Sequence, residues 1–455
     1  METAGGPSDR VRSLGLFTDL YELTMLRAYR AVGFDETAVF SLFVRRLPAA
    51  RNFLVACGLD DFLAELEARR FEADDIAYLR AQGFPDDFLD WLKLYRFSGD
   101  VFALPEGTLF FENEPILEIV GPIGEAQLIE TLAINQVGFA SMIAAKAARV
   151  VEAAAGRAVV DFGSRRAHGF DAAIKAARAS YMAGAASTSN VLAGKLYGIP
   201  VAGTMAHSFV QAFDDESEAF RAFARVYPET VLLVDTYDTL EGVKKVIALA
   251  KELGSDFQVR AVRLDSGDLA ALAKASRALL DEAGLENVGI FASGGLDETK
   301  IAALLAAGAP IDGFGVGTDL VVSADAPSLD IVYKLTEYAS EGRIKLSSGK
   351  RTLPGRKQVF RVIENGAMAH DTIARADEAL PGTPLLKQVM RAGRRMEAPE
   401  PLAAIRARCR EAIATLPAEI RALEKAARPY PVAVSAALAD EERGVRARIA
   451  EASRR

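Results

Sequence analysis

The chain has 455 residues, half of them hydrophobic, and a formal net charge of −8. This length allows two or three domains of ~100–200 residues each, and the composition supports a large buried core rather than general disorder. The acidic balance argues against a general nucleic-acid surface, and no uninterrupted apolar run reaches the roughly 18 residues that a membrane span needs.

Targeting and redox signals are sparse. The first ten residues lack the basic and then apolar pattern of a secretory signal. The only cysteines, Cys57 and Cys409, lie far apart and form neither a metal-type spacing nor a disulfide framework. We therefore expect a reducing, cytoplasmic setting, with no membrane and no nucleic acid as partner.

The first part of the chain predicts a small, partly antiparallel sheet domain. Helical patterns dominate at first, and short β-like segments separated by turn residues follow. An apolar, alanine-rich stretch then has the length of a largely buried helix, or of two. The predicted strands are residues 38–45, 100–104, 108–112 and 115–120, and the apolar stretch is 127–155.

From residue 158 onward, strand and helix patterns alternate. Alternating β and α elements predict a parallel sheet with right-handed crossovers, and six such units in a row favour a barrel over an open sheet. The predicted strands are 158–162, 199–202, 230–234, 259–264, 288–292 and 311–316, with helices that include 240–253, 269–283 and 297–307.

Three β-like segments at residues 333–335, 342–346 and 358–363 should return to the first domain's sheet. The basic run 391–395 is expected on a solvated helix face. The predicted fold class is α/β: an irregular parallel α/β barrel, a discontinuous α+β sheet domain and a C-terminal helical segment. The predicted domains are residues 1–120 with 331–395, residues 121–330, and residues 396–455.

Polar or glycine-rich residues accompany the end of every predicted barrel strand. Because the carboxyl ends of parallel strands meet at one rim, these residues should converge. His207, one of three histidines, follows the second strand, where a neutral imidazole can accept a proton, a metal or a phosphoryl group. A capping or buried structural histidine is the alternative. The other strands carry DFGSRR (161–166), DTYD (235–238), RLDSGD (263–268), SGG (293–295) and GVGTD (315–319).

These groups suit phosphosugar binding. Glycines let backbone N–H groups approach phosphate oxygens, and phosphate sites after the last two strands are common in such barrels. The guanidinium of arginine has a permanent positive charge and a forked set of donors, which suits phosphate or carboxylate. A pair of aspartates suits Mg²⁺ or a cationic sugar centre. The arginines are Arg165, Arg166 and Arg263, and the aspartates are Asp235 and Asp265; for Arg166, Asp238 and Asp268 a plain salt bridge is the alternative.

Six motifs closely resemble those of the nicotinate phosphoribosyltransferase family. The likeness runs in order from residue 14 to 365, and the last 60 residues carry no recognised motif. The motifs are TDLYELTM (18–25), PEG (105–107), EP (114–115), DFGSRR (161–166), GTMAHS (203–208) and RLDSGD (263–268).

The resemblance implies a type II phosphoribosyltransferase-like barrel that joins nicotinate to 5-phosphoribosyl-1-pyrophosphate, giving nicotinate mononucleotide and pyrophosphate in NAD salvage. It implies ATP as co-substrate, which phosphorylates His207, and Mg²⁺ as cofactor, held through pyrophosphate by Asp235 and Asp265. These three residues are the implied catalytic set. A cytoplasmic homodimer is also implied.

The same resemblance implies the substrate contacts. Tyr21 would cross the dimer interface and stack on the pyridine ring, and Phe162 would cover the ring's other face. Arg165 and Arg263 would lie by the ring and the pyrophosphate, and Thr204 would also bind substrate. The implied 5′-phosphate residues are Ser293, Gly294, Gly317 and Thr318.

Several alternatives remain. A nicotinamide-using relative would carry an acid in the stretch that here reads STSN (187–190), and a quinolinate-using one would lack the phosphohistidine. A barrel isomerase or aldolase would need a Lys or Glu base at a strand end, and a ligand sensor would lack His207 or Asp265. We expect Trp91 to serve packing and Glu106 and Glu114 to serve turns or a domain interface, while the roles of His168 and His370 stay open.

Overall fold

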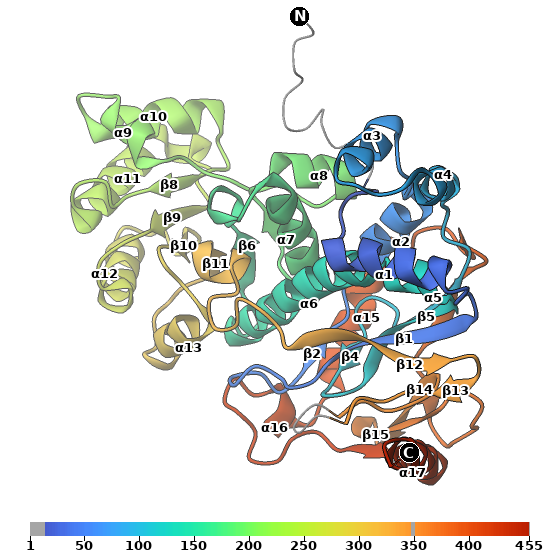
Figure 1. Ribbon diagram of the computed structural model, residues 1–455. Coiled ribbons are helices and arrows are strands. Elements are labelled where there is room, and N and C mark those ends of the chain that lie inside the picture. Colours follow the sequence, from blue (N-terminus) through green and yellow to red (C-terminus); the bar gives the residue numbers. More distant parts are fainter. Residues whose placement is uncertain (1–13, 347–350, 455) are drawn as a thin grey trace, which may run out of the picture. The chain divides into compact units, whose positions relative to one another are not determined.

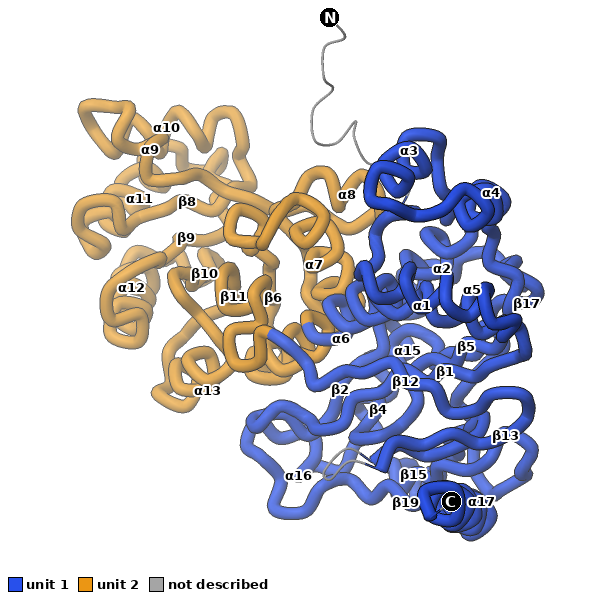
Figure 2. Tube along the Cα trace, in the orientation of Figure 1, with its two compact units in different colours: residues 1–142, 328–455 blue, residues 143–327 orange. Residues whose placement is uncertain are grey.

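The computed structural model describes residues 14–346 and 351–454, and the chain divides into two compact units (Figures 1 and 2). The first unit comprises residues 1–142 and 328–455, and the second comprises residues 143–327. The first division falls inside helix α6 (Glu130–Ala153) rather than near residue 120, and residues 396–455 belong to the first unit. The first ten residues, weighed above for a secretory signal, lie outside the described part.

A seven-stranded antiparallel sheet organises the first unit. Strand β1 (Thr37–Val44) pairs with β5 (Pro115–Pro122) on one side and with β12 (Ile331–Tyr338) on the other. Residues 333–335 and 342 thus return to the first sheet, as predicted, but the predicted strand 358–363 does not, because it pairs with residues 367–375 and 383–384 in a separate four-stranded sheet. The order is β13 (Glu341–Gly342), β12, β1, β5, β3 (Asp100–Ala103), β17 (Lys387–Arg391) and β18 (Arg394–Arg395).

The C-terminal segment adds a strand as well as helices. Strand β19 (Val432–Val434) pairs in parallel with β15 (Ala367–Arg375), between helices of the segment that the sequence predicts to be helical. The other strands of this unit are β14 (Lys357–Glu364), β16 (Thr383–Pro384), β2 (Leu54–Val55) and β4 (Leu109–Phe110), and its helices are α1 (Leu20–Ala31), α2 (Leu59–Ala68), α3 (Ala73–Ala81), α4 (Asp86–Leu94), α5 (Ile123–Gln127), the start of α6, α15 (Leu402–Ala414), α16 (Ala418–Arg421) and α17 (Ala436–Ala452).

The basic run 391–395 lies on a β-hairpin, so the predicted helix face was wrong. Ala392 and Gly393 both have positive φ, +47° and +73°, which suits a two-residue hairpin turn and stops a helix. The Arg395 side chain is only 13% exposed and donates to Asp60. The charge pattern alone did not distinguish a hairpin with a largely covered arginine from a solvated helix face.

The predicted apolar stretch 127–155 forms one helix, α6, and the short helix α5 precedes it. Residues Ile123–Ala153 are long and apolar enough, by length and composition, to cross a membrane, and 72% of the relevant window is buried inside the structure. A buried core helix has the same composition.

The second unit is built on a six-stranded parallel sheet that forms a half-barrel, which confirms the predicted parallel α/β fold. The predicted strand at 199–202 is reduced to one bridge between Val201 and Thr188, because Pro200 has no N–H to donate. The strand order is β7 (Ser187–Thr188), β6 (Ala158–Asp161), β11 (Gly313–Val316), β10 (Gly289–Ala292), β9 (Ala261–Leu264) and β8 (Val231–Leu233).

Helices connect the parallel strands, and α12 packs against β9 and β10. The sheet's buried side chains, such as Leu232, Val262 and Ile290, are fully inaccessible to solvent. The connecting helices are α7 (Phe170–Met182), α8 (Val191–Tyr197), α9 (His207–Gln211), α10 (Glu216–Val226), α11 (Thr239–Leu253), α12 (Leu269–Glu282), α13 (Glu298–Ala306) and α14 (Thr318–Val321).

Candidate active site at the strand ends of the second unit

Asp235 and Asp265 follow neighbouring parallel strands, and the structure joins them. The Asp235 carboxylate (Oδ2) accepts the backbone N–H of Asp265 at 3.0 Å and the Ser266 hydroxyl at 2.6 Å. Its second oxygen, Oδ1, is buried and has no hydrogen-bond partner among the described residues. An unpaired buried carboxylate oxygen is costly unless a ligand meets it, so Asp235 presents one free acceptor at the rim.

His207 lies beside this pair at the start of α9. Its Nδ1 is 3.1 Å from the Thr236 hydroxyl, and its Nε2 is 3.9 Å from Oδ2 of Asp265. The imidazole is 40% exposed, so it is not sealed in the core. A threonine that accepts a hydrogen bond from Nδ1 would leave the Nε2 lone pair free. Sequence reasoning had given Thr236 no role.

Arg263 and Thr204 belong to the same cluster. The Arg263 guanidinium donates to the Thr204 hydroxyl at 2.5 Å, while its Nε is buried without a hydrogen-bond partner within the described ranges. Burial lowers the Arg263 pKa, and the nearby positive charge of Arg165 acts in the same direction. A partly desolvated guanidinium with unused donors is suited to bind an anion.

Phe162 packs closely against the sheet because Gly315 has no side chain. A Cβ at Gly315 would lie 2.4 Å from the Phe162 ring, which is closer than real contacts allow. The Arg263 guanidinium carbon lies 6.0 Å from the centre of that ring, and Phe291 lies 6.1 Å from it. Gly315, considered earlier for phosphate contact, therefore serves to seat an aromatic ring beside a cation.

Asp161 holds the turn that presents Phe162. Its carboxylate accepts the Gly163 backbone N–H at 2.8 Å and the Thr188 hydroxyl at 2.7 Å. Burial raises the Asp161 pKa, and the residue is 2% exposed. The stretch 187–190 thus has a carboxylate as neighbour, although it contains none itself, and both oxygens of that carboxylate are engaged. Sequence reasoning missed this role.

The two glycine loops differ in what they offer a phosphate. Gly294, Gly295 and Thr318 are exposed, with Gly317 partly exposed. Ser293 is 2% exposed, and its hydroxyl donates to Oδ1 of Asp265 at 2.5 Å. The serine side chain therefore orients a carboxylate, and exposed backbone is what the loop presents.

Other strand-end acids cap helices. Asp238 accepts the Glu241 N–H at the start of α11, and Asp268 accepts the N–H groups of Ala270 and Ala271 at the start of α12. The sequence left a salt bridge as the alternative for both residues, and neither forms one among the described contacts. Their carboxylates satisfy helix N–H groups that would otherwise lack partners.

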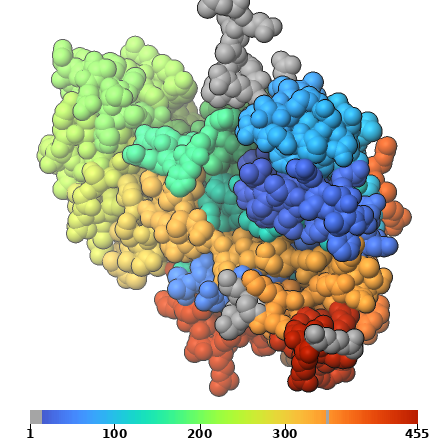
Figure 3. All heavy atoms as spheres, in the orientation of Figure 1, coloured from blue at the N-terminus to red at the C-terminus, as the bar shows by residue number. Residues whose placement is uncertain are grey.

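Several of the remaining sequence candidates are exposed side chains, and Arg165 is near enough to Arg263 to lower its pKa. Arg165 and Arg166 are exposed on the short turn after β6, as is His168. Tyr21 is 44% exposed on α1, which lies on the surface of the first unit (dark blue in Figure 3). Burial and neighbouring Glu130 raise the Tyr21 pKa. Trp91 is partly buried and packs against the hydrophobic core, and the Arg30 guanidinium carbon lies 4.4 Å from the centre of its ring.

Comparison with known proteins places the chain in a family. Three family models match it in succession: the nicotinate phosphoribosyltransferase N-terminal domain over residues 16–138, the family itself over 158–356, and the C-terminal domain over 381–441. A nicotinate phosphoribosyltransferase of Mycobacterium tuberculosis is 60% identical over 422 residues, covering 92% of this chain and 91% of the relative. The chain belongs to the nicotinate phosphoribosyltransferase family.

Further relatives span the same architecture. A nicotinate phosphoribosyltransferase of Bacillus subtilis is 45% identical over 377 residues, 80% of this chain and 77% of its own length. The crystal structure of human nicotinic acid phosphoribosyltransferase matches with a TM-score of 0.83 and 31% identity, covering 94% of this chain and 99% of that one. The C-terminal segment, which carried no recognised motif, is thus part of the family's architecture.

Proposed function

We propose that this chain transfers phosphoribosyl from 5-phosphoribosyl-1-pyrophosphate to nicotinate, forming nicotinate mononucleotide and pyrophosphate, with the reaction coupled to ATP through phosphorylation of His207. The ring nitrogen of nicotinate forms the bond to the sugar carbon as the bond to pyrophosphate breaks. The observation that carries the proposal is the connected cluster of His207, Asp265, Asp235 and Arg263 at adjacent strand ends.

The coupling step is assigned to Nε2 of His207. Hydrogen bonding of Nδ1 to Thr236 leaves Nε2 free to attack the γ-phosphorus of ATP, which releases ADP. Water later cleaves the phosphorus–nitrogen bond and releases phosphate. Because phosphorylation places negative charge near the Asp265 carboxylate, the two states of His207 differ in their electrostatic fit to a pyrophosphate, as coupling requires.

Mg²⁺ is proposed as the cation that offsets this charge. Among the described residues no cluster of three or more His, Cys, Asp or Glu side chains could hold a metal by itself. Mg²⁺ is usually held by one or two carboxylates together with substrate phosphates. The unpartnered Oδ1 of Asp235 and the adjacent Asp265 fit this pattern, and the ion would supply charge neutralisation at the pyrophosphate.

Recognition of nicotinate is assigned to Arg263 and Phe162. The unused donor of Arg263 favours a carboxylate over an amide, and the nearby ring offers a stacking face. Asp161 does not compete for an amide because both of its oxygens are occupied. Stacking by Tyr21 from the partner of a homodimer, and a cytoplasmic location, remain predictions.

The test is a product assay with nicotinate, nicotinamide and quinolinate, each with and without ATP. We expect nicotinate mononucleotide, with synthesis stimulated by ATP. In the H207A variant ATP should no longer raise the rate, while slow synthesis continues; the matched control H370A, on β15 of the first unit, should keep the stimulation. Label from [γ-³²P]ATP should appear as an acid-labile phosphate in the intact chain and in H370A only. Equal rates with and without ATP in the intact chain would contradict the coupling.

A further inference from the structure

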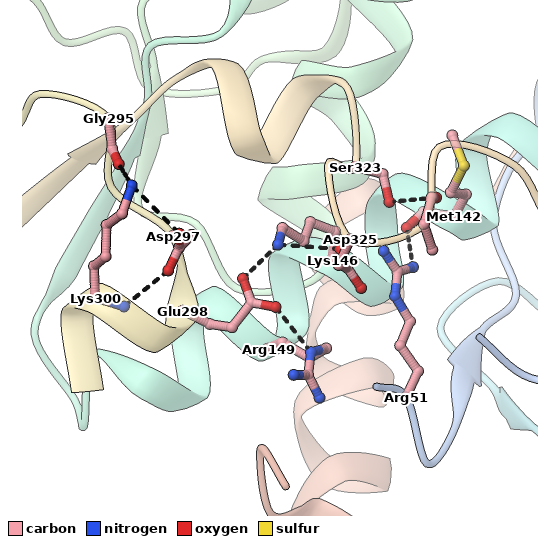
Figure 4. Close-up of polar contacts among 11 residues, drawn as sticks. Arg51, Met142, Lys146, Arg149, Gly295, Asp297, Glu298, Lys300, Ser323 and Asp325 are labelled. Carbon is pink, nitrogen blue, oxygen red and sulfur yellow. Dashed lines mark hydrogen bonds and ion pairs between the residues drawn. The ribbon is translucent and has the colours of Figure 1, made fainter. Parts of the chain in front are cut away.

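We infer that Lys146 is a positioning residue for the 5′-phosphate site: its buried ammonium sets the spacing between the two glycine loops. This inference rests on the proposed function for the identity of the phosphate. Lys146 lies on α6 and its side chain is 3% exposed. It binds Glu298 at 2.5 Å and Asp325 at 3.1 Å (Figure 4).

Each carboxylate belongs to a segment that supports one loop. Glu298 is the first residue of α13, directly after the loop 293–297 that contains Gly294. Asp325 follows α14, the short helix that begins at Thr318. One ammonium group therefore ties the support of the first loop to the support of the second, from the side of α6.

The first loop is held at additional points. Arg149, one turn further along α6, donates from Nε to Glu298 at 3.1 Å. Lys300 donates to the Gly295 carbonyl at 2.5 Å, which fixes the orientation of that peptide (Figure 4). Lys146, Arg149 and Glu298 are buried, and together with the partly exposed Asp325 they form a cluster that is balanced in charge. Loss of Lys146 therefore leaves two carboxylates beside one guanidinium, and the buried Glu298 has little water to offset the change.

Loss of Lys146 should affect the 5′-phosphate end of 5-phosphoribosyl-1-pyrophosphate and not its pyrophosphate end. Asp235, proposed to act at the pyrophosphate, accepts the Ser266 hydroxyl and the backbone N–H of Asp265, with no contact to Lys146 among the interactions described above. Ser293, whose hydroxyl orients Asp265, is fixed to β9 by its own backbone N–H, which donates to the Leu264 carbonyl at 2.8 Å. A shift of about 1 Å between the glycine loops should weaken binding of the 5′-phosphate by tenfold or more. Pyrophosphate binding should be spared.

Calorimetric titration with ribose 5-phosphate, and separately with pyrophosphate and Mg²⁺, tests this without relying on catalysis. We expect K146M to weaken ribose 5-phosphate at least about tenfold and pyrophosphate less than twofold. D325N, which keeps the Lys146–Glu298 pair, should give a smaller loss with the same selectivity. The matched control is K245M, which removes an ammonium 3.1 Å from buried Glu216 between α10 and α11; it should show no such selectivity.

Several results would overturn the inference. One is an unchanged affinity for ribose 5-phosphate in both K146M and D325N, and another is an equal loss of affinity for ribose 5-phosphate and pyrophosphate in K146M. The same selective loss in K245M, or no binding of ribose 5-phosphate by the intact chain, would also overturn it. Failure of the proposed function is separate: a chain that makes no nicotinate mononucleotide, yet loses ribose 5-phosphate selectively in K146M, would refute the activity and support the positioning role.

Discussion

Replacing Gly294 with alanine should damage the site through Asp265. Gly294 has φ +95°, and a Cβ built there would lie 1.8 Å from the Asp265 carbonyl oxygen. Relief requires a movement of about 1 Å or more, and misplacement on this scale costs roughly 100-fold in rate. The left-handed backbone adds about 1–3 kcal/mol of strain for a non-glycine residue. We therefore expect kcat/KM for 5-phosphoribosyl-1-pyrophosphate to fall about 100-fold.

Gly295 provides the matched control for this experiment. It also has positive φ, +60°, but its added Cβ would meet only the flexible Lys300 ammonium, at 4.0 Å. G295A therefore carries similar backbone strain without the collision, and should lose less than about tenfold in kcat/KM. Steady-state product formation gives the rates, and thermal melting followed by circular dichroism reports the strain of each variant. Equal rate losses in G294A and G295A would refute the contact with Asp265 as the cause.

Three further predictions address the histidine, the ring and the buried acids. T236V, which removes the partner of Nδ1, should lower ATP stimulation about tenfold; stimulation at the normal level would show that Thr236 does not orient His207. G315A should raise KM for nicotinate about tenfold by displacing the Phe162 ring, with KM for the sugar substrate unchanged, and an equal rise in both constants would contradict this. Burial, and next the charge of Asp371, raise the Glu114 pKa well above its usual value. The native state therefore keeps the proton, and stability falls as pH rises above the pKa that Glu114 has in the unfolded chain. The melting temperature of E114Q should fall less than that of the intact chain between pH 5 and 8, and parallel profiles would contradict the assignment.

The repeated pattern at the ends of β8 and β9 shows what local sequence can specify. Asp235 and Asp238 have the same spacing as Asp265 and Asp268, and in both pairs the first acid lies at the rim while the second caps the next helix. An aspartate directly before a helical pattern is an N-cap signal. The capping role of Asp238 and Asp268 could therefore be predicted from the sequence, and a salt bridge was the less supported alternative.

Other features depend on contacts between distant segments. The Ser293 hydroxyl binds Asp265, and Asp161 binds Thr188, because parallel pairing brings their strands together. A two-residue strand such as β7 has too few residues to show a period. The hairpin at 387–395 is likewise stabilised by pairing of β17 with β3, which lies almost 300 residues earlier in the chain.

The pairing of β1 with β12 has a consequence for how the polypeptide is made. The first sheet joins residues 37–44 to residues 331–338, and β3 to β17. Ribosomes synthesise the chain from its amino end, so the α/β half, which is continuous in sequence, is complete while β1 and β3, already able to pair with β5, each still lack one neighbouring strand. Each of these strands keeps one edge unpaired until residues 331–338 or 387–391 have been made, and this interval is where chaperones would be needed most.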